Sequence, residues 1–394
     1  MRKHLPVAVT GLGCLCAAGA DLAECMASLF AGKRQPKAPT LFTTGHAVAY
    51  PVFEAPLAEP EQAGLLRTSR LALVAAAEAL ADSGWSPEAL RGKRVGVCIG
   101  TTIGGTTSDE GFCRALRAGV HPDLAPMKRI LGSNPARSLA REFGFTGPSQ
   151  TIVNACSSGT DAVGIGASWI RAGFCDLVLA GGADELGRVT YNGFTSLMIT
   201  DESPVKPFDK NRKGLNLGEG AGMLVLESEM LRGRRNKAAR GFVLGYGSAC
   251  DAHHLTAPHP EGLGLKRALA EALQCSGLTP DAIAFVNAHG TGTPDNDRVE
   301  SRVLSDVLPM VPFLSTKGYT GHTLGAAGAI EAVFTLACLE QRRIPANVGF
   351  SEPDPELPAT PVREITVVQG AAALSESLAF GGNNAVLALG RGES

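Results

Sequence analysis

One cysteine, Cys156, lies in the stretch VNACSSGTDAVGIG (residues 153–166), between a short apolar run and a series of small residues. If a strand ends at Ala155 and a helix begins near Ser157, the sulfur lies at a helix N-terminus. The free N–H groups and the dipole there favour a thiolate and lower the thiol pKa. The backbone N–H of the cysteine can also donate to an oxyanion. The competing interpretation is a small thiol packed in the core, and this stretch alone leaves both open.

A histidine follows another apolar segment, in the stretch VNAHGTGTPDNDRVE (residues 286–300). We expect His289 and the glycines after it to form a loop at a sheet edge, with polar groups in a cleft. Thr291 and Thr293 offer hydroxyls to an amide or hydroxyl-bearing ligand. A glycine-rich surface turn with a hydrogen-bonded histidine explains the same residues equally well.

A lysine and a second histidine, Lys317 and His322, occur among small residues in LSTKGYTGHTLGAAGAIEAV, with Glu331 further along a predicted helix. A lysine with so few charges around it in the sequence needs a carboxylate partner, and Glu300 or Asp297 could provide it. The alternative is a lysine that extends to solvent and a histidine that caps the helix.

Two glycine-rich stretches point to different conclusions. In LAFGGNNA (378–385), Gly381 and Gly382 permit unusual backbone angles beside Phe380, so the segment could move or bring N–H groups close to a ligand. The stretch GLNLGEGAG (214–222) lacks the spacing and the lysine of a phosphate-binding loop, and no GxGxxG opens a helix after the first strand. Nucleotide binding is therefore disfavoured.

The elements that must position these residues alternate between short apolar runs and helical patterns. A helical stripe covers residues 69–84, and strands are predicted at 6–13, 94–101, 149–155 and 176–182. The second part of the chain repeats this style. Alternation of this kind indicates an α/β protein with buried mixed sheets. The two parts of the chain also show a weak internal similarity, because each places a reactive side chain just before a helix of small residues. This similarity favours two similar halves that meet near residues 230–240.

The overall composition excludes several classes of protein. The chain has 394 residues, 44% hydrophobic and 19% charged, with a net charge of −2, so no general attraction to nucleic acid or an anionic membrane is expected. None of the 10 cysteines forms a CxxC pair, which disfavours a structural zinc site and fits reduced thiols in a cytoplasmic protein. Pro6 and nearby glycines interrupt the apolar N-terminal run, so we expect neither a signal peptide nor a membrane span.

Taken in order along the chain, the motifs resemble those of the β-ketoacyl-[acyl-carrier-protein] synthases, the decarboxylating condensing enzymes of the thiolase superfamily. The resemblance runs nearly end to end. It is carried by VAVTGLGCLCAAGADLAECMASLFAGK, GPSQTIVNACSSGTDAV, LVLAGGADE, VKPFDKNRKGLNLGEGAGMLVLE, DAHHLTAPHPEG, VNAHGTGTPDNDRVE, STKGYTGHTLGAAGAIEAV and LAFGGNNA. It implies a thiolase-like fold, with two pseudo-symmetric α/β halves in an α-β-α-β-α core. The predicted halves are residues 1–235, with the cysteine, and 236–394, with the histidines.

The resemblance also assigns roles to single residues. Cys156 matches the acylated nucleophile, and its N–H with that of Phe380 would form the oxyanion hole. His289 and His322 match the paired histidines, and Lys317 the lysine of the STK motif. Glu300 matches the carboxylate that partners this lysine, and Asp297 and Glu331 are supporting carboxylates. Thr291 and Thr293 match the threonines that contact the phosphopantetheine arm. Phe380 matches a gating aromatic residue.

The implied reaction is a decarboxylating condensation of an acyl thioester, carried on Cys156, with malonyl-acyl carrier protein, in fatty acid or type II polyketide or aryl polyene biosynthesis. No cofactor or metal is implied, because the carrier protein's phosphopantetheine holds the substrates. The implied partners are an acyl carrier protein and a second subunit, in a homodimer or a ketosynthase-type heterodimer. Two alternatives are a non-elongating subunit of the chain-length-factor type and a thiolase. The first loses the nucleophile, and the second uses a further cysteine where this chain has LAFGGNNA.

The chain departs from the family pattern before the predicted gate. SESLAFGG places Glu376, Leu378 and Ala379 where Asn-Ser-Phe is common, which leaves the acyl-chain preference open but not the reaction class. An acidic carrier protein also implies a basic docking surface, for which the candidates are Arg67, Arg70, Lys128 and Arg129.

Overall fold

The computed structural model describes residues 5–58, 65–104, 110–132 and 134–393. Its strands are β1 (Val7–Cys16), β2 (Val95–Gly100), β3 (Ser149–Ile152), β4 (Leu177–Asp184), β5 (Gly220–Glu227), β6 (Gly241–Cys250), β7 (Ile283–Asn287), β8 (Phe313–Leu314), β9 (Arg343–Ile344), β10 (Thr366–Val367), β11 (Ala372–Ala379) and β12 (Asn383–Arg391).

The helices lie between these strands. They are α1 (Leu22–Phe30), α2 (Arg67–Ser83), α3 (Pro87–Leu90), α4 (Glu110–Arg117), α5 (Ala125–Gly132), α6 (Pro135–Phe143), α7 (Ser158–Arg171), α8 (Arg188–Ser196), α9 (Glu229–Arg235), α10 (Leu263–Ser276), α11 (Pro294–Val307), α12 (Lys317–Thr320) and α13 (Ala327–Gln341), with 3-10 turns η2 (Pro280–Ala282), η3 (Leu324–Ala326) and η4 (Phe380–Gly382).

Ten of the strands form two five-stranded sheets of the same topology, which join edge to edge into one continuous ten-stranded sheet, and β9 and β10 pair separately. One has the order β3-β2-β4-β5-β1 and the other β8-β7-β11-β12-β6, and a short antiparallel contact from Val7–Val243 to Val9–Gly241 joins them. Numbered within its own half, with β9 and β10 left out, each five-stranded sheet reads 3-2-4-5-1. Parallel and antiparallel pairs also fall at the same places in both. The predicted α/β class with mixed sheets is confirmed.

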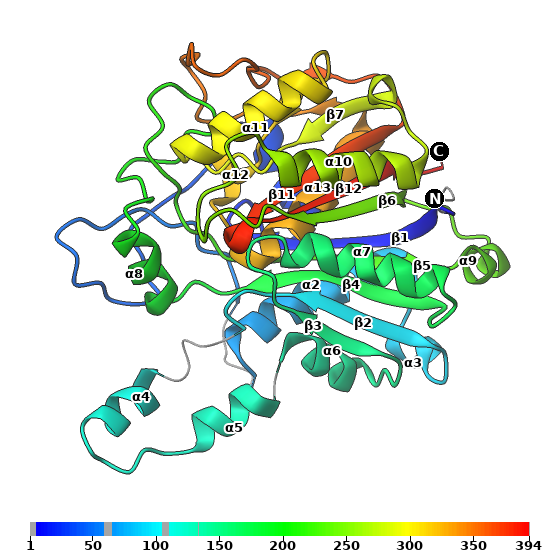
Figure 1. Cartoon of the computed structure of the whole chain (residues 1–394). Helices are drawn as coiled ribbons and strands as arrows, with labels where there is room; N and C mark the ends of the chain where they lie inside the picture. Colours follow the sequence, from blue (N-terminus) through cyan, green and yellow to red (C-terminus); the bar gives the residue numbers. More distant parts are fainter. Residues whose placement is uncertain (1–4, 59–64, 105–109, 133, 394) are drawn as a thin grey trace.

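Helices cover both faces of both sheets, which gives the layered α-β-α-β-α arrangement (Figure 1). Helices α7 and α13 lie between the two sheets, α2 and α6 cover the outer face of one, and α10 covers the outer face of the other. Because both faces are covered, β1, β2, β4 and β5 are buried along their whole length and read as apolar runs rather than as alternating patterns.

Glycines let the two central helices approach each other closely. A side chain at Gly159 of α7 would come within 2.8 Å of the carbonyl oxygen of Gly325 and of the backbone nitrogen of Ala329. At Gly328 of α13, a Cβ would collide with Thr160. The small residues of both motifs therefore serve a close helix contact directly behind the cavity described below.

Element boundaries differ from the predictions mainly at β3. This strand ends at Ile152 instead of residue 155, because the chain turns at Ala155, which has a φ of 48°. The predicted helix at 69–84 is α2, and α7 begins at Ser158, with Ser157 as its N-cap. One stretch, Leu324–Gln341, has the length and composition of a membrane span, but 89% of it is buried between the sheets.

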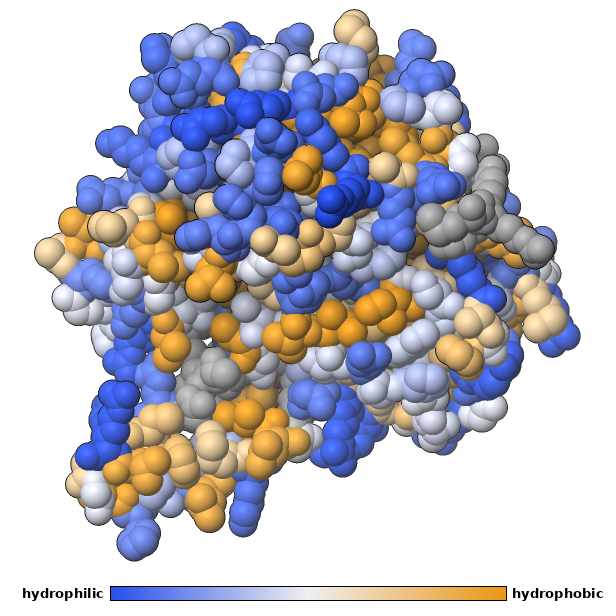
Figure 2. All heavy atoms as spheres, in the orientation of Figure 1, coloured by the Kyte–Doolittle hydropathy of each residue, from blue (hydrophilic) through white to orange (hydrophobic). Residues whose placement is uncertain are grey.

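Helices α4 and α5 project from the layered body (Figure 1), and apolar side chains gather on this projection (Figure 2). Leu116, Val120, Leu124 and Leu131, on these helices and the segment between them, are all more than half exposed. Exposed apolar surface of this extent is typical of a face that contacts another chain.

Candidate active site

The turn between β3 and α7 places Cys156 in front of the N-terminus of α7. Ala155, directly before the cysteine, has the positive φ that only a well-supported turn holds in a residue with a side chain. The support comes from Asp161 in the first turn of α7. Its carboxylate accepts hydrogen bonds from Asn154 Nδ2 at 2.7 Å, Ser157 Oγ at 2.8 Å and Tyr246 Oη at 2.7 Å.

The Cys156 thiol is buried, with 5% of the residue exposed. Burial raises the pKa of Cys156 to about 11, although the charge of Lys317 and a hydrogen bond from the backbone N–H of Phe380 both act to lower it. The expectation that the helix N-terminus leaves Cys156 with a lowered pKa is therefore wrong, because desolvation of the thiolate outweighs the favourable dipole and charges.

His322 lies against the cysteine sulfur and is held in one tautomer. Its Nε2 is 3.1 Å from Cys156 Sγ, and its Nδ1 accepts a hydrogen bond from the backbone N–H of Leu324 at 3.2 Å. Burial, followed by the charge of Lys317, lowers the pKa of His322 well below its usual value, so the ring is neutral at pH 7. A neutral ring whose Nδ1 accepts carries its proton on Nε2. His322 thus donates toward the sulfur and the cavity.

His289 is fixed in the same tautomer by a different donor. Lys317 Nζ lies 3.0 Å from His289 Nδ1 and 2.5 Å from Glu331 Oε1. Burial lowers the pKa of His289 well below its usual value, and the charge of Lys317 lowers it further. The neutral ring accepts the lysine N–H at Nδ1 and presents Nε2–H to the cavity, with its centroid 5.2 Å from that of His322.

The carboxylate that partners Lys317 is Glu331, not Glu300 or Asp297 as predicted. Glu300 Oε1 and Oε2 accept the backbone N–H groups of His289 at 2.5 Å and Gly290 at 2.7 Å, so Glu300 holds the histidine loop. Asp297 accepts the N–H groups of Phe208 and Gly292 at 2.7 and 3.2 Å. Glu331 lies on α13, which passes behind the lysine, whereas Glu300 and Asp297 point from α11 into the loop that precedes them.

Cys156 and both histidines line one cavity of about 200 Å³, together with Thr291, Thr293 and Phe380. The two threonine hydroxyls are 2.8 Å apart. Phe380 stacks on Phe194, with ring centroids 5.6 Å apart, and Gly381 and Gly382 follow it with φ angles of 84° and 77°. The structure thus brings together all the residues predicted to surround the nucleophile.

Sequence reasoning missed several residues that shape this cavity. Its apolar wall includes Phe194, Leu197, Ile199 and Leu215, which come from α8 and the chain after it. Asp184, at the end of β4, accepts hydrogen bonds from the Thr101 hydroxyl and from the N–H groups of Thr102, Ile103 and Gly325, and so ties η3 to β2. An acidic residue that ends an otherwise apolar strand, as in LVLAGGADE, is the one signal that could have identified it.

Glu376, one of the departures from the family pattern, is fully buried on β11. Burial and repulsion from Glu300 raise the pKa of Glu376 well above its usual value. The pKa of Glu300 is likewise raised by burial, to about 7, against the hydrogen bonds from the loop. Two neighbouring carboxyl groups therefore lie behind the histidine loop, and at least one of them is protonated at pH 7.

Two of the predicted docking residues are not available for docking. Arg67 forms a two-point ion pair with Glu219, at 2.9 and 2.6 Å, and Arg70 is buried with 8% of its surface exposed. Lys128 is exposed on α5, and the side chain of Arg129 lies outside the described residues. Arg70 is thus part of the buried interior, and Arg67, which is partly exposed, is held by the buried carboxylate of Glu219.

The arrangement suits acyl transfer and enolate stabilisation. A thiol at a helix N-terminus can carry an acyl group, and two imidazole N–H donors can bind a thioester oxygen that becomes negatively charged. Among the described residues, the cavity contains no group of His, Cys, Asp and Glu atoms at metal-ligand separations; the one such group lies elsewhere in the molecule.

Comparison with known families agrees with this chemistry. Residues 52–230 match the model of the Beta-ketoacyl synthase N-terminal domain, and residues 240–351 match that of the Beta-ketoacyl synthase C-terminal domain.

Individual relatives extend the similarity over the whole chain. The chain is 34% identical to 3-oxoacyl-[acyl-carrier-protein] synthase 2 of Synechocystis, over 82% of this chain and 81% of that one. It is also 34% identical to the tetracenomycin polyketide synthase ketoacyl synthase alpha subunit of Streptomyces glaucescens, over 99% of both chains. Among solved structures, the ishigamide ketosynthase/chain length factor superimposes with a TM-score of 0.93 at 32% identity, over 99% of this chain and 100% of that one.

Proposed function

Because the chain belongs to the β-ketoacyl synthase family, we propose that it condenses an acyl group with a malonyl unit, both supplied as thioesters of an acyl carrier protein. The observation that carries this proposal is the pair of neutral histidines whose Nε2–H groups face the cavity of Cys156. A nucleophile alone would fit any acyltransferase, whereas two fixed donors beside it fit an enolate intermediate.

In the first step, the acyl thioester transfers to Cys156. The sulfur of Cys156 attacks the carbonyl carbon, the bond from that carbon to the carrier's sulfur breaks, and the proton lost from Cys156 is balanced by the one that the departing sulfur takes up, so the carrier leaves as a free thiol. The tetrahedral oxyanion is stabilised by the backbone N–H groups of Cys156 and Phe380. The donors around Cys156, from His322 and the Phe380 backbone, offset part of the cost of its buried thiolate.

In the second step, malonyl-carrier protein loses carbon dioxide, and the electron pair of the broken bond forms an enolate. His289 and His322 donate to the thioester oxygen, each contributing about 3 kcal/mol of stabilisation. The enolate carbon then attacks the acyl-Cys156 thioester, which releases the 3-oxoacyl-carrier protein and the thiolate. Lys317 and Glu331 keep His289 in the donating tautomer, while Thr291 and Thr293 contact the phosphopantetheine arm and Phe380 gates its entry.

The proposal includes the setting in which the chain works. We infer a cytoplasmic enzyme that needs no cofactor other than the carrier's phosphopantetheine, and whose halves divide at residues 235 and 236. Near full-length similarity to a polyketide ketosynthase, over 99% of both chains, and to a 3-oxoacyl-[acyl-carrier-protein] synthase 2 of Staphylococcus aureus, over 98% of both chains, supports a role in polyketide or fatty acid synthesis. The exposed apolar projection of α4 and α5 supports a dimer, and the neighbour that is solved with a chain length factor makes a heterodimer the form to test first.

The decisive experiment incubates the protein with a panel of acyl-carrier proteins and measures the mass added to the Cys156 peptide. We expect one acyl group per chain, absent from Cys156→Ala. Cys156→Gln is expected to release carbon dioxide from malonyl-carrier protein without forming a 3-oxoacyl product. An acyl adduct that persists on Cys156→Ala would contradict the assignment of the nucleophile.

The same experiment separates the alternatives. A non-elongating subunit of the chain-length-factor type would take up no acyl group, and the presence of Cys156 beside His322 argues against it. A thiolase would condense coenzyme A esters without release of carbon dioxide. It would also need a second cysteine in the cavity, and among the described residues Cys156 is the only cysteine that lines it.

A further inference from the structure

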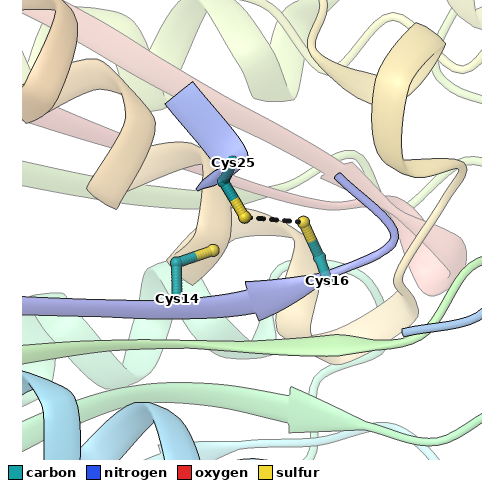
Figure 3. A group of neighbouring side chains, drawn as sticks. All are labelled: Cys14, Cys16 and Cys25. Atoms are coloured by element: carbon teal, nitrogen blue, oxygen red, sulfur yellow. Dashed lines mark hydrogen bonds between the residues drawn. The ribbon is translucent and has the colours of Figure 1, made fainter. Parts of the chain in front are cut away.

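Three thiols meet in the core far from Cys156 in the sequence, and the reaction proposed above does not use them. Cys14, Cys16 and Cys25 are each fully buried, and their sulfur atoms all lie within 4.8 Å of one another (Figure 3). The closest pair, Cys16 and Cys25, is 3.6 Å apart. The spacing in sequence does not match a C-x2-C motif, which is why the sequence predicted no metal site.

The backbone fixes the three sulfurs on converging elements. Cys14 and Cys16 are two residues apart on β1, so their side chains leave the same face of the strand. Cys25 faces them from the fourth residue of α1. A tight turn joins the two elements, closed by hydrogen bonds of 3.1 and 3.0 Å between the backbones of Cys16 and Gly19.

A carboxylate from a third element holds this arrangement without contact to the sulfurs. Glu78 of α2 accepts the N–H of Cys14 on β1 at 2.8 Å and the N–H of Leu22 on α1 at 2.9 Å. The Glu78 carboxylate thus joins the strand to the helix and helps to hold the three thiols near one another without a ligand. Such preorganisation is what a ligand site requires.

The donor set selects the kind of ligand. No further His, Cys, Asp or Glu atom of the described residues joins the group, so its side chains offer three sulfurs and no carboxylate oxygen; the nearest backbone oxygen, of Gly19, is 3.5 Å from Cys25 Sγ. Structural zinc and iron–sulfur clusters take four protein ligands, and calcium and magnesium take oxygen. Soft thiolates without oxygen donors favour monovalent copper. An ion in the plane of the three sulfurs, about 2.3 Å from each, requires the sulfurs to lie about 4.0 Å from one another. This separation falls between the 3.6 Å of the closest pair and the 4.8 Å within which all three sulfurs lie.

The apolar surroundings of the three thiols favour an ion that leaves the site with little net charge. The thiols belong to the apolar core formed with Leu22, Met26, Ile330 and Phe334, where a net charge is costly. A monovalent ion that replaces one thiol proton leaves the site neutral, whereas a divalent ion must displace two. The turn at Ala17, Ala18 and Gly19, next in sequence to Cys16, lines an open hollow on the surface, so only this short turn separates Cys16 along the chain from solvent.

We propose that Cys14, Cys16 and Cys25 form a binding site for one monovalent copper ion, which clips β1 to α1. The ion binds as one S–H bond breaks and one S–Cu bond forms, with the proton passing to water. The other two sulfurs coordinate through lone pairs, copper stays in oxidation state +1, and no electron is transferred. The inference does not depend on the proposed condensing activity.

The test uses the full chain with Cys113→Ser, Cys156→Ala and Cys250→Ser, which removes the exposed thiols and the active-site sulfur. Anaerobic titration with a Cu(I) acetonitrile complex against a chromophoric Cu(I) chelator is expected to show one tightly held ion per chain. Cys14→Val, Cys16→Val and Cys25→Val should each weaken binding by at least about tenfold. The matched control, Cys275→Ala, removes a buried thiol from α10 and should leave the affinity unchanged.

Two measurements keep the test independent of how well the valine variants fold. X-ray absorption on the copper-loaded background chain is expected to show three sulfur neighbours at about 2.3 Å. Its thermal unfolding midpoint should rise with added Cu(I). Equal affinity in all variants, a nitrogen or oxygen shell, or no retained copper would overturn the site. Retention of zinc but not of copper through the same cysteines would overturn the choice of ion.

Discussion

Two opposing effects act on the pKa of the Cys156 thiol. Burial raises the pKa and the helix N-terminus lowers it, and the effect of burial is larger. Its pKa of about 11 means that about one thiol in ten thousand is ionised at pH 7. In the proposed mechanism, the surrounding N–H donors stabilise the thiolate and the oxyanions that follow; they do not keep the resting sulfur charged. Because the thiolate is the reactive form, a thiol that stays mostly protonated also undergoes fewer side reactions before acylation.

We therefore expect alkylation of Cys156 to accelerate steadily with pH. Since the raised pKa keeps the thiolate fraction proportional to hydroxide concentration, the rate with iodoacetamide should rise about tenfold per unit from pH 7 to 9.5. Peptide mass spectrometry at several pH values measures it, with exposed Cys113 in the same sample as the internal control. A plateau for Cys156 below pH 9 would show that its pKa is not raised.

The tautomer of His289 depends on one lysine. Replacing Lys317 by Met removes the donor to Nδ1, so the ring no longer has to present Nε2–H to the thioester oxygen. We expect malonyl decarboxylation to fall about 100-fold, measured as carbon dioxide release in the Cys156→Gln background.

Two controls accompany the lysine variant. Lys93→Met, at the surface beside Trp85, should leave carbon dioxide release unchanged. In Lys317→Met, the pKa of His289 should also rise, because the lysine charge lowers it in the parent chain. A variant with full decarboxylation and an unmoved histidine titration would show that Lys317 does not position the ring.

At the scale of elements, the β3–α7 turn depends on a single carboxylate. Asp161 collects hydrogen bonds from the turn on one side and from Tyr246 of β6 on the other. It thereby joins the cysteine of one half to the sheet of the other. The positive φ of Ala155 persists because these contacts hold it.

Substitution Asp161→Ala should therefore destabilise the fold and displace Cys156, the proposed nucleophile. Loss of three hydrogen bonds to a buried carboxylate is expected to lower the free energy of unfolding by at least about 3 kcal/mol, measured by urea denaturation. Tyr246→Phe removes only one of the three bonds and should cost about a third to a half as much. If both variants lost equal stability, the Asn154 and Ser157 bonds would contribute nothing.

At the scale of the whole molecule, the two sheets bury acids as well as apolar side chains. Glu376 has a raised pKa in the folded state, so the folded chain holds its proton more tightly than the unfolded chain does. Its contribution to stability is then fully present below the unfolded pKa, near 4.3, and declines as pH rises toward the folded value. The slope is at most about 1.4 kcal/mol per pH unit.

The variant Glu376→Gln should remove this slope. Relative to the parent chain, its free energy of unfolding is expected to increase as pH rises from 5.5 to 7.5, by up to about 1.4 kcal/mol per unit. Chemical denaturation at three pH values measures the difference, with exposed Glu364→Gln as the matched control. A pH-independent difference between Glu376→Gln and the parent would contradict the raised pKa.

Local sequence was enough to predict the class of fold and much of the candidate site. Strand and helix positions follow from hydrophobic periodicity and turn residues, which act over a few neighbours. Cys156, the two histidines and Lys317 stand in motifs whose order carries the family resemblance. What periodicity could not predict is where β3 stops, because that end is decided by contacts of Asp161 with a distant strand.

Tertiary structure alone decided which charged groups meet and what burial does to them. Glu331 rather than Glu300 partners Lys317, Arg67 is paired with the buried Glu219, and Cys156 has a raised rather than a lowered pKa. The convergence of Cys14, Cys16 and Cys25 likewise needs the turn before α1. Electrostatic energy depends on distance and solvent exposure, which are set only when elements far apart in sequence pack together, whereas helix and strand preference is written in each residue and its neighbours.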